Sequence, residues 1–131
     1  MSTKNHRTTG STPSPSLQRI LEQARNKGGF QVSVLTSTEG LPIITTPSTY
    51  NSDLASAMVA LLQKVSNEAQ RQLGMSEVDE VTIRGRDHTR LVCRRIIVAE
   101  DELILVAIVP PGHAYRRVMN WAVREIRRAL S

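Results

Sequence analysis

Aromatic residues and cysteine are scarce in this sequence. Its 131 residues include one Phe, one Trp, two Tyr and one Cys, while 40% of the chain is hydrophobic. The core must therefore be built mainly from aliphatic side chains. A single cysteine cannot form an internal disulfide, and without companions it makes a poor metal site. Such cysteine usage is typical of a reducing compartment, so we expect a cytoplasmic protein.

Long apolar runs are missing as well. No segment approaches the ~20 apolar residues that a membrane-spanning helix requires. Polar residues follow Lys4 and Arg7, where a signal peptide would need an apolar stretch. Residues 1–14 contain no apolar residue after Met1, so we predict a disordered polar tail there. Residues 15–131 fit a single domain.

Motifs for catalysis and cofactor binding are also absent. His6, His88 and His113 stand in no motif with a nucleophile or an acid, and no glycine-rich phosphate loop is present. Cys93 lies in a strand pattern and is predicted to be a small core residue. The acidic residues 100–102 predict a solvated turn rather than a cation site. We therefore expect no catalysis by the chain alone, no cofactor and no metal.

The first half of the chain predicts a helix followed by a β-hairpin. Helical spacing of apolar residues begins near residues 14–16, and Gly28 ends this helix. Strands at 30–36 and 41–46 are separated by a tight turn, which indicates a hairpin. Pro42 cannot donate a ladder hydrogen bond, so we expect the second strand at the edge of the sheet.

The second half predicts a long helix, three strands and a final helix, at 52–73, 80–84, 90–98, 103–109 and 114–130. Residues 103–109 are apolar at every position, so this strand must be covered on both faces and belongs at the centre of the sheet. Short connections favour antiparallel pairing. The sequence therefore predicts an α+β fold, a five-stranded antiparallel sheet with helices on both faces.

Arginines account for much of the net charge of +5 and gather on the third and fourth strands and on the last helix. Sheets that bind RNA also carry aromatic residues for base stacking, and these strands have none, so nucleic acid is not the favoured partner. On the last helix, Trp121 projects toward the side of Arg124, a composition typical of binding hot spots. Packing of Trp121 against the first helix is the favoured interpretation, because lone large aromatics are seldom exposed.

Four segments between residues 17 and 130 together form a family-like pattern, in this order: GGFQVSVLTSTEGLPI, DLASAMVALLQKVSNEAQRQLG, EVTIRGRDHTRLVCRRI and ELILVAIVPPG. By these segments and their spacing, the chain resembles the Roadblock/dynein light chain domain family. The resemblance implies a roadblock/profilin-like sandwich. It also implies a dimer in which the third strand pairs with its twin and the two long helices lie side by side. The interface residues implied here are Met58, Val59, Leu62, Val81, Thr82, Ile83 and Arg84.

The resemblance also implies a partner. Bacterial members often regulate small Ras-like GTPases, so we expect a non-enzymatic homodimeric scaffold, or a heterodimer with a paralogue, that binds such a GTPase and modulates its GTP hydrolysis. Two alternatives stay open: a basic module for nucleic acid or, weakly, an anionic membrane surface, and a small-molecule sensor. A core without convergent polar residues speaks against the sensor. Candidate partner-binding residues are Gln63, Lys64, Asn67, Arg71, Trp121 and Arg124.

Overall fold

The computed structural model describes residues 15–49 and 53–131. The predicted tail at 1–14 and Ser52, the predicted first residue of the long helix, lie outside the described residues. Within the described ranges the elements follow in the predicted order: α2 (Pro15–Gly28), β1 (Val32–Ser37), β2 (Pro42–Thr46), α3 (Asp53–Leu73), β3 (Glu80–Arg84), β4 (Arg90–Val98), β5 (Asp101–Val109) and α4 (Arg116–Leu130).

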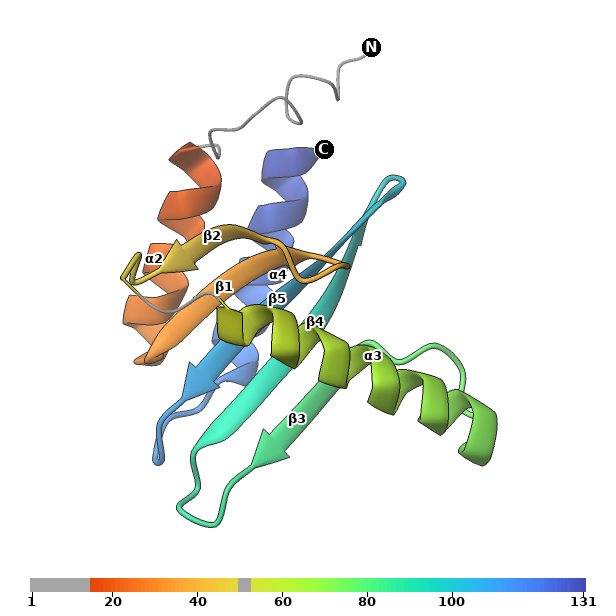
Figure 1. Ribbon diagram of the computed structural model, residues 1–131. Coiled ribbons are helices and arrows are strands. Elements are labelled where there is room, and N and C mark those ends of the chain that lie inside the picture. Colours follow the sequence, from red (N-terminus) through yellow and green to blue (C-terminus); the bar gives the residue numbers. More distant parts are fainter. Residues whose placement is uncertain (1–14, 50–52) are drawn as a thin grey trace.

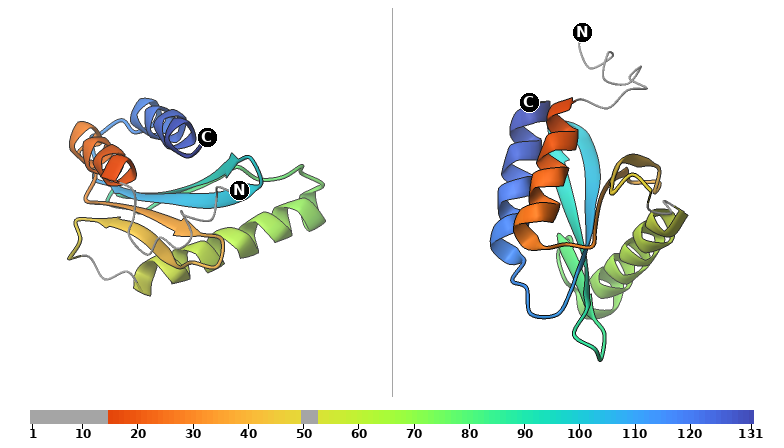
Figure 2. Two further views of the ribbon diagram at one scale, coloured as in Figure 1. Left: turned by 90° about the horizontal axis from the view of Figure 1, so that it is seen from above. Right: turned by 90° about the vertical axis from the view of Figure 1, so that its left-hand side faces the viewer.

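The five strands form one antiparallel sheet in the order β2-β1-β5-β4-β3. The continuously apolar β5 lies at the centre, and β2, which begins with Pro42, lies at an edge, as expected from the sequence. The helices α2 and α4 cover one face, and α3 crosses the other (Figures 1 and 2). The predicted fold class is therefore confirmed.

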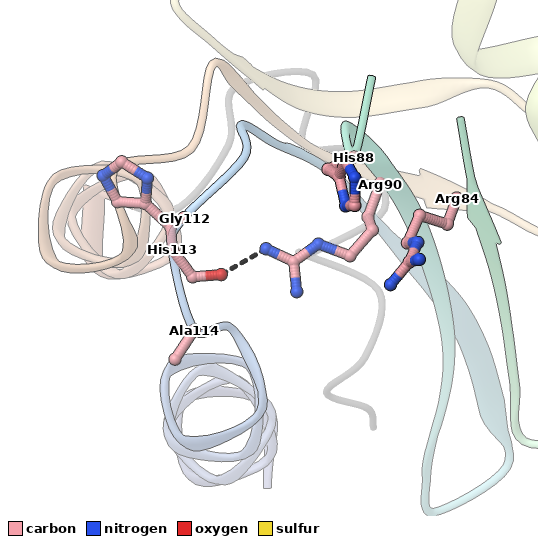
Figure 3. Close-up of a pocket in the computed structure, with 6 residues that line it drawn as sticks. All are labelled: Arg84, His88, Arg90, Gly112, His113 and Ala114. Atoms are coloured by element: carbon pink, nitrogen blue, oxygen red, sulfur yellow. Dashed lines mark hydrogen bonds between the residues drawn. The ribbon is translucent and has the colours of Figure 1, made fainter. Parts of the chain in front are cut away.

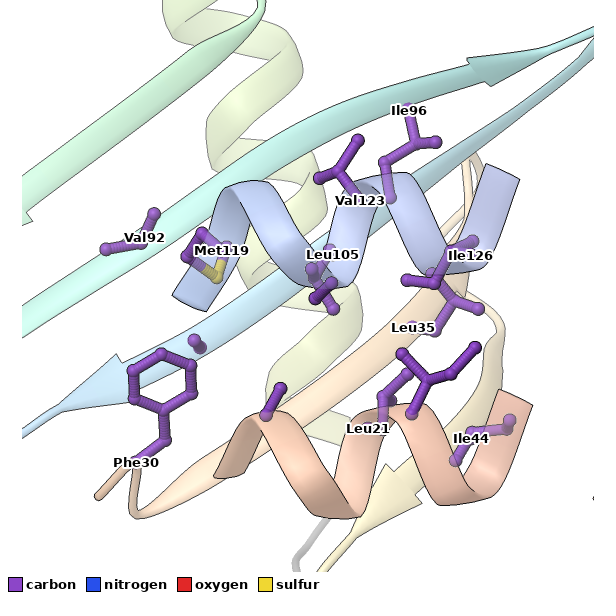
Figure 4. Close-up of a cluster of buried hydrophobic side chains, with 14 of the residues drawn as sticks. Leu21, Phe30, Leu35, Ile44, Val92, Ile96, Leu105, Met119, Val123 and Ile126 are labelled. Atoms are coloured by element: carbon purple, nitrogen blue, oxygen red, sulfur yellow. The ribbon is translucent and has the colours of Figure 1, made fainter. Parts of the chain in front are cut away.

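The core has two unequal halves, one on each face of the sheet. Between the sheet and the pair α2/α4, eighteen buried residues of the described chain form one cluster (Figure 4). Between the sheet and α3, the corresponding cluster has eight. Alternation along β5 supplies both halves, because Leu105 belongs to the larger cluster and its neighbours Ile104 and Val106 to the smaller.

The acidic turn predicted at 100–102 is wrong in its extent. Only Ala99 and Glu100 turn the chain, and β5 begins at Asp101. Glu102 lies in the strand because its carboxylate forms an ion pair with the half-buried Arg95 of β4. A charged partner compensates the burial of this carboxylate, so the strand extends two residues further than hydropathy indicates.

Other boundaries differ from the prediction by one or two residues: β1 begins at Val32 and ends at Ser37, and β2 begins at Pro42. The predicted first strand begins at Phe30, but the N–H of Phe30 donates to the carbonyl of Arg25 (2.9 Å) and so belongs to the end of α2. Phe30 is buried nonetheless and joins the larger cluster. The last helix begins at Arg116 rather than at Ala114.

The β1–β2 hairpin is held against the start of α3. Ser56 donates its hydroxyl to the carbonyl of Gly40 (2.8 Å). Gly40 has φ +87°, and a Cβ at this position would lie 2.8 Å from the Ser56 Cα. Glycine is therefore required at this turn, both for its backbone conformation and for the close approach of the helix.

Candidate functional site

Helix α3 has two apolar sides, and only one of them faces the sheet. Its inner side consists of Ala55, Val59, Leu62 and Ser66, all buried under the sheet. A second apolar stripe, which we call the outer stripe, consists of Leu54, Leu61 and Val65 with the half-buried Met58. At ~3.6 residues per turn, the outer stripe lies about a quarter of a turn away from the inner side. A helix of this pattern has apolar surface left over after packing on its own sheet.

Two residues of the expected dimer interface lie inside the subunit instead. Val59 and Leu62 are 2% and 1% exposed and contact the sheet, so neither can meet a second subunit. The residues missed by the sequence reasoning are Leu54, Leu61 and Val65. In the sequence, the apolar residues of α3 form one wide stripe. Only the position of the sheet shows that this stripe consists of two faces, the inner side and the outer stripe.

Strand β3 is the open edge of the sheet. It pairs with β4 on one side, and within the described chain no strand pairs with its other side. Val81 packs beside the α3 cluster, and Ile83, two residues on, points to the same face and is 42% exposed. Thr82 and Arg84 are exposed and point to the opposite face. An edge of this kind, with an apolar side chain in solvent, is a template for strand pairing.

Gln63 and Arg95 connect α3 to the sheet on the flank opposite the outer stripe. Gln63 donates to the carbonyl of Thr38 (3.5 Å) and accepts from the Arg95 guanidinium (3.3 Å). Arg95 also donates to the carbonyl of Val78 (3.1 Å) and binds Glu102. Gln63, expected to bind a partner, is thus engaged in fixing α3, and the outer stripe faces away from this network.

The other predicted partner-binding residues divide between two surfaces. Lys64, Asn67 and Arg71 are on the outside of α3, and Arg71 pairs there with Glu68. Arg124 is exposed on α4, on the other side of the sheet. The structure therefore does not bring the six candidates together in one site.

Trp121 lies between α4 and α2. Its ring packs against the larger cluster, and the Lys27 ammonium lies 4.0 Å from the ring centroid. Together with Arg19 and Arg128 it lines a shallow groove between the two helices. The favoured interpretation, packing against the first helix, is confirmed.

Two of the strand arginines are fixed by contacts around α4. Arg94 donates to Asn120 of α4 (2.9 Å) and lies 3.5 Å from the carboxylate of Glu80. Arg90 donates to the carbonyls of Pro110 and His113, which ties β4 to the loop before α4 (Figure 3). Beside this contact lies a shallow pocket of about 310 Å³, lined by Arg84, His88, Arg90, Gly112, His113 and Ala114.

Cys93 is the only thiol, and its surroundings keep it protonated. It is buried in the α3 cluster, and burial, assisted by the nearby charge of Glu80, raises the pKa of the Cys93 thiol to about 11. A thiol of this pKa is a poor nucleophile near neutral pH. Among the described residues, no three His, Cys, Asp or Glu side chains are grouped as metal ligands. No helix in the described ranges is long and apolar enough to cross a bilayer.

The comparison with protein families identifies the domain. The Roadblock/LC7 domain model matches residues 17–108. The chain belongs to the Roadblock/LC7 family. The match ends before α4, so the arginine-rich last helix of this roadblock protein lies outside the shared sequence pattern. None of the curated proteins matches the chain.

Solved structures with the same fold include several MglB proteins. Myxococcus xanthus MglB has a TM-score of 0.74 and 18% identity, with 88% of this chain and 94% of that chain covered. The gliding protein mglB of Thermus thermophilus has a TM-score of 0.69 and 15% identity, with 90% of each chain covered. A structure described as MglB with tetrameric arrangement has a TM-score of 0.70 and 15% identity, covering 89% and 91%. At these identities the likeness establishes the fold.

Proposed function

We propose that this roadblock protein is a non-enzymatic homodimeric scaffold that binds a Ras-like small GTPase and modulates its GTP hydrolysis. Two observations together support the dimer. Strand β3 has an open edge, and the exposed Ile83 of this strand lies on the same face of the sheet as the outer stripe of α3. The strand and the helix both expose apolar side chains that a second copy would cover. The tetrameric arrangement described for one MglB structure supports self-association.

The sequence of β3 favours one register for the dimer. In an antiparallel pair of identical strands, opposite residues lie on the same face of the sheet. Pairing centred on Thr82 brings Glu80 opposite Arg84 of the second copy, twice, and Val81 opposite Ile83. Opposite charges then meet on the α4 face and apolar side chains meet on the α3 face. Such cross-strand pairs contribute roughly 0.2–1 kcal/mol each.

The outer stripe completes this interface. A two-fold axis perpendicular to the sheet keeps both copies of α3 on the same face and makes them antiparallel. The outer stripe faces away from the Gln63–Arg95 network, so it is free to pack against its twin. Leu54, Leu61 and Val65 are 39–46% exposed in the single chain. Their burial at about 25 cal/mol per Å² would add to the pairing of the strands.

The dimer is tested by Ile83→Asp. Two carboxylates at the seam would stand in apolar surroundings, so sedimentation equilibrium should show the dissociation constant rising at least about tenfold. Ile97→Asp is the matched control, because Ile97 is 49% exposed on β4 beyond the end of β3. A wild-type protein that is monomeric at micromolar concentration, or equal effects of both variants, would overturn the assigned interface.

The GTPase partner is tested separately. Ras-like GTPases of the source organism, loaded with GDP or with a non-hydrolysable GTP analogue, are passed over immobilised protein. We expect one GTPase to bind in one nucleotide state and Lys64→Glu with Arg71→Glu to weaken this binding without changing the dimer. A dimer that binds no GTPase in either state would contradict this part of the proposal and leave the dimer standing.

A further inference from the structure

Positive charge is concentrated on the layer formed by α2 and α4, which we call the basic layer. The two helices carry eight arginine and lysine residues and two glutamates, a net charge of +6. The whole chain has a net charge of +5, so all other residues together carry −1. The charge of the protein therefore belongs to one face, and solubility alone does not require such segregation.

Three of the five arginines of α4 point away from its buried side. Met119, Ala122 and Ile126 form the buried side of the helix. Arg117, Arg124 and Arg128 lie on the opposite side, at ~100° per residue, and all three are exposed. At ~1.5 Å per residue they form a row about 17 Å long.

Helix α2 extends this row sideways. It lies beside α4, antiparallel to it, and the two helices are in contact along their length (Figure 2). Arg19 is exposed and lines the groove between them, and Lys27 lies over the Trp121 ring. The Arg128–Glu125 ion pair, in which Arg128 is 75% exposed, reduces this charge only locally. The result is a broad, shallow cationic surface rather than a pocket.

We propose that the basic layer binds the surface of an anionic phospholipid bilayer. The charge complementarity is direct, and each Lys or Arg near such a surface contributes about 1 kcal/mol. The proposed dimer would strengthen this binding by presenting two basic layers, and only for this gain does the inference rest on the proposed function. The two-fold axis of the dimer would leave both basic layers on one side, so that an extended flat target contacts both at once.

A bilayer fits this surface better than nucleic acid does. The basic side chains are spread over two neighbouring helices, and the groove between these helices is shallow and includes Glu125 beside Arg19 and Arg128, so its lining is not the continuous positive track that a nucleic-acid backbone would follow. The one Trp of the chain is packed between the helices, so no exposed ring of the basic layer offers a stacking platform for bases. Binding would be electrostatic and peripheral, with the α3 face left open to a protein partner.

The full chain is tested with large vesicles of phosphatidylcholine alone and of phosphatidylcholine with phosphatidylglycerol. Sedimentation of the vesicles should carry the protein down only when the anionic lipid is present. Binding should be strong at about 0.1 M salt and lost near 1 M, where the Debye length falls from ~10 to ~3 Å. Trp121 gives a second readout, since energy transfer to dansyl headgroups should be more efficient when α2 and α4 face the membrane than when α3 does.

Two charge-matched variants locate the contact. Arg117→Gln with Arg124→Gln should weaken binding to anionic vesicles at least about 30-fold, the equivalent of two lost contacts of about 1 kcal/mol each in one subunit, and by more where both subunits of a dimer contact the bilayer. Lys64→Gln with Arg71→Gln removes the same charge from α3 and should change the binding less than about threefold. Equal losses in both variants would mean that only net charge matters and would overturn the assigned surface.

The remaining outcomes separate this inference from the proposed function. Failure of the dimeric wild type to bind anionic vesicles at low salt overturns the inference and leaves the dimer untouched. Binding of duplex DNA, but not of vesicles, through the same arginines overturns the bilayer in favour of nucleic acid. A monomeric wild type that still binds vesicles overturns the dimer, while the basic layer is supported.

Discussion

The two faces of the sheet differ in what covers them. Two helices close the α2/α4 face over a cluster of eighteen buried residues, and their outer surface is charged. One helix covers the α3 face over eight, and apolar side chains of that helix and of β3 are in solvent. The α2/α4 face is fully covered and presents charged side chains to solvent. The α3 face has exposed apolar side chains of the kind that another polypeptide covers. We therefore assign a charged partner to the α2/α4 face and a protein partner to the α3 face.

The largest effect on stability is expected in the α2/α4 half of the core. Ile126 of α4 is fully buried in the larger cluster. Ile126→Ala should lower the free energy of unfolding by about 2–5 kcal/mol, because it removes buried methyl groups and leaves a cavity. Urea denaturation at one fixed protein concentration measures this loss. A loss below about 1 kcal/mol would mean that the α2/α4 half of the core is not close-packed.

A smaller loss is expected from Arg95, which couples the α3 face to the sheet. Arg95→Ala leaves Glu102, Gln63 and the carbonyl of Val78 without their partner. Breaking this half-buried network should cost about 2–3 kcal/mol in the same urea experiment. Arg71→Ala is the control, because its exposed pair with Glu68 is expected to contribute less than about 1 kcal/mol. Equal losses would refute the coupling role of Arg95.

The pH dependence of stability tests whether solvent reaches the smaller cluster. Burial holds the pKa of Cys93 at about 11, above the ordinary value of 9.0. Between these values the unfolded chain releases the thiol proton and the folded chain retains it. Stability should therefore fall by about 1.4 kcal/mol per pH unit in this window from this group, and the contribution should be absent below about pH 9.

Cys93→Ala isolates this contribution, because the two proteins differ only at this side chain. The difference in unfolding free energy between wild type and variant should therefore shift with pH only above about 9. The thiol should also react slowly with a disulfide reagent at about pH 8 in the folded protein and rapidly in urea. Parallel pH profiles for the two proteins would show that solvent reaches the α3 cluster.

Most of the fold could be predicted from the sequence, because local patterns determine it. The unbroken apolar run of β5 required cover on both faces and so placed this strand at the centre. Pro42 predicted an edge for β2. The start of β5 was missed, because Glu102 lies in the strand only by virtue of Arg95, a partner that the local pattern does not reveal.

The candidate site was predicted less completely. The resemblance implied that the third strand pairs with its twin, and β3 does lie at an edge of the sheet, whereas Val59 and Leu62, implied as interface residues, are buried against the subunit's own sheet. Helical periodicity shows which apolar residues lie on one side of a helix. It does not show which of two neighbouring apolar surfaces contacts the subunit's own sheet. Gln63 was likewise interpreted as free surface, although Arg95, 32 residues later, holds it.

Oxidative cross-linking of Thr82→Cys tests the proposed dimer and its register most directly. Pairing centred on Thr82 places the two introduced thiols on directly opposite residues, within the Cα separation of ~4.4–6.8 Å that a disulfide requires. We predict a covalent dimer under mild oxidation, and none for Ile97→Cys or for the wild type, whose Cys93 is buried. Absence of the cross-link in Thr82→Cys under conditions where the protein sediments as a dimer would contradict this register. Absence together with a monomeric protein would contradict the dimer itself.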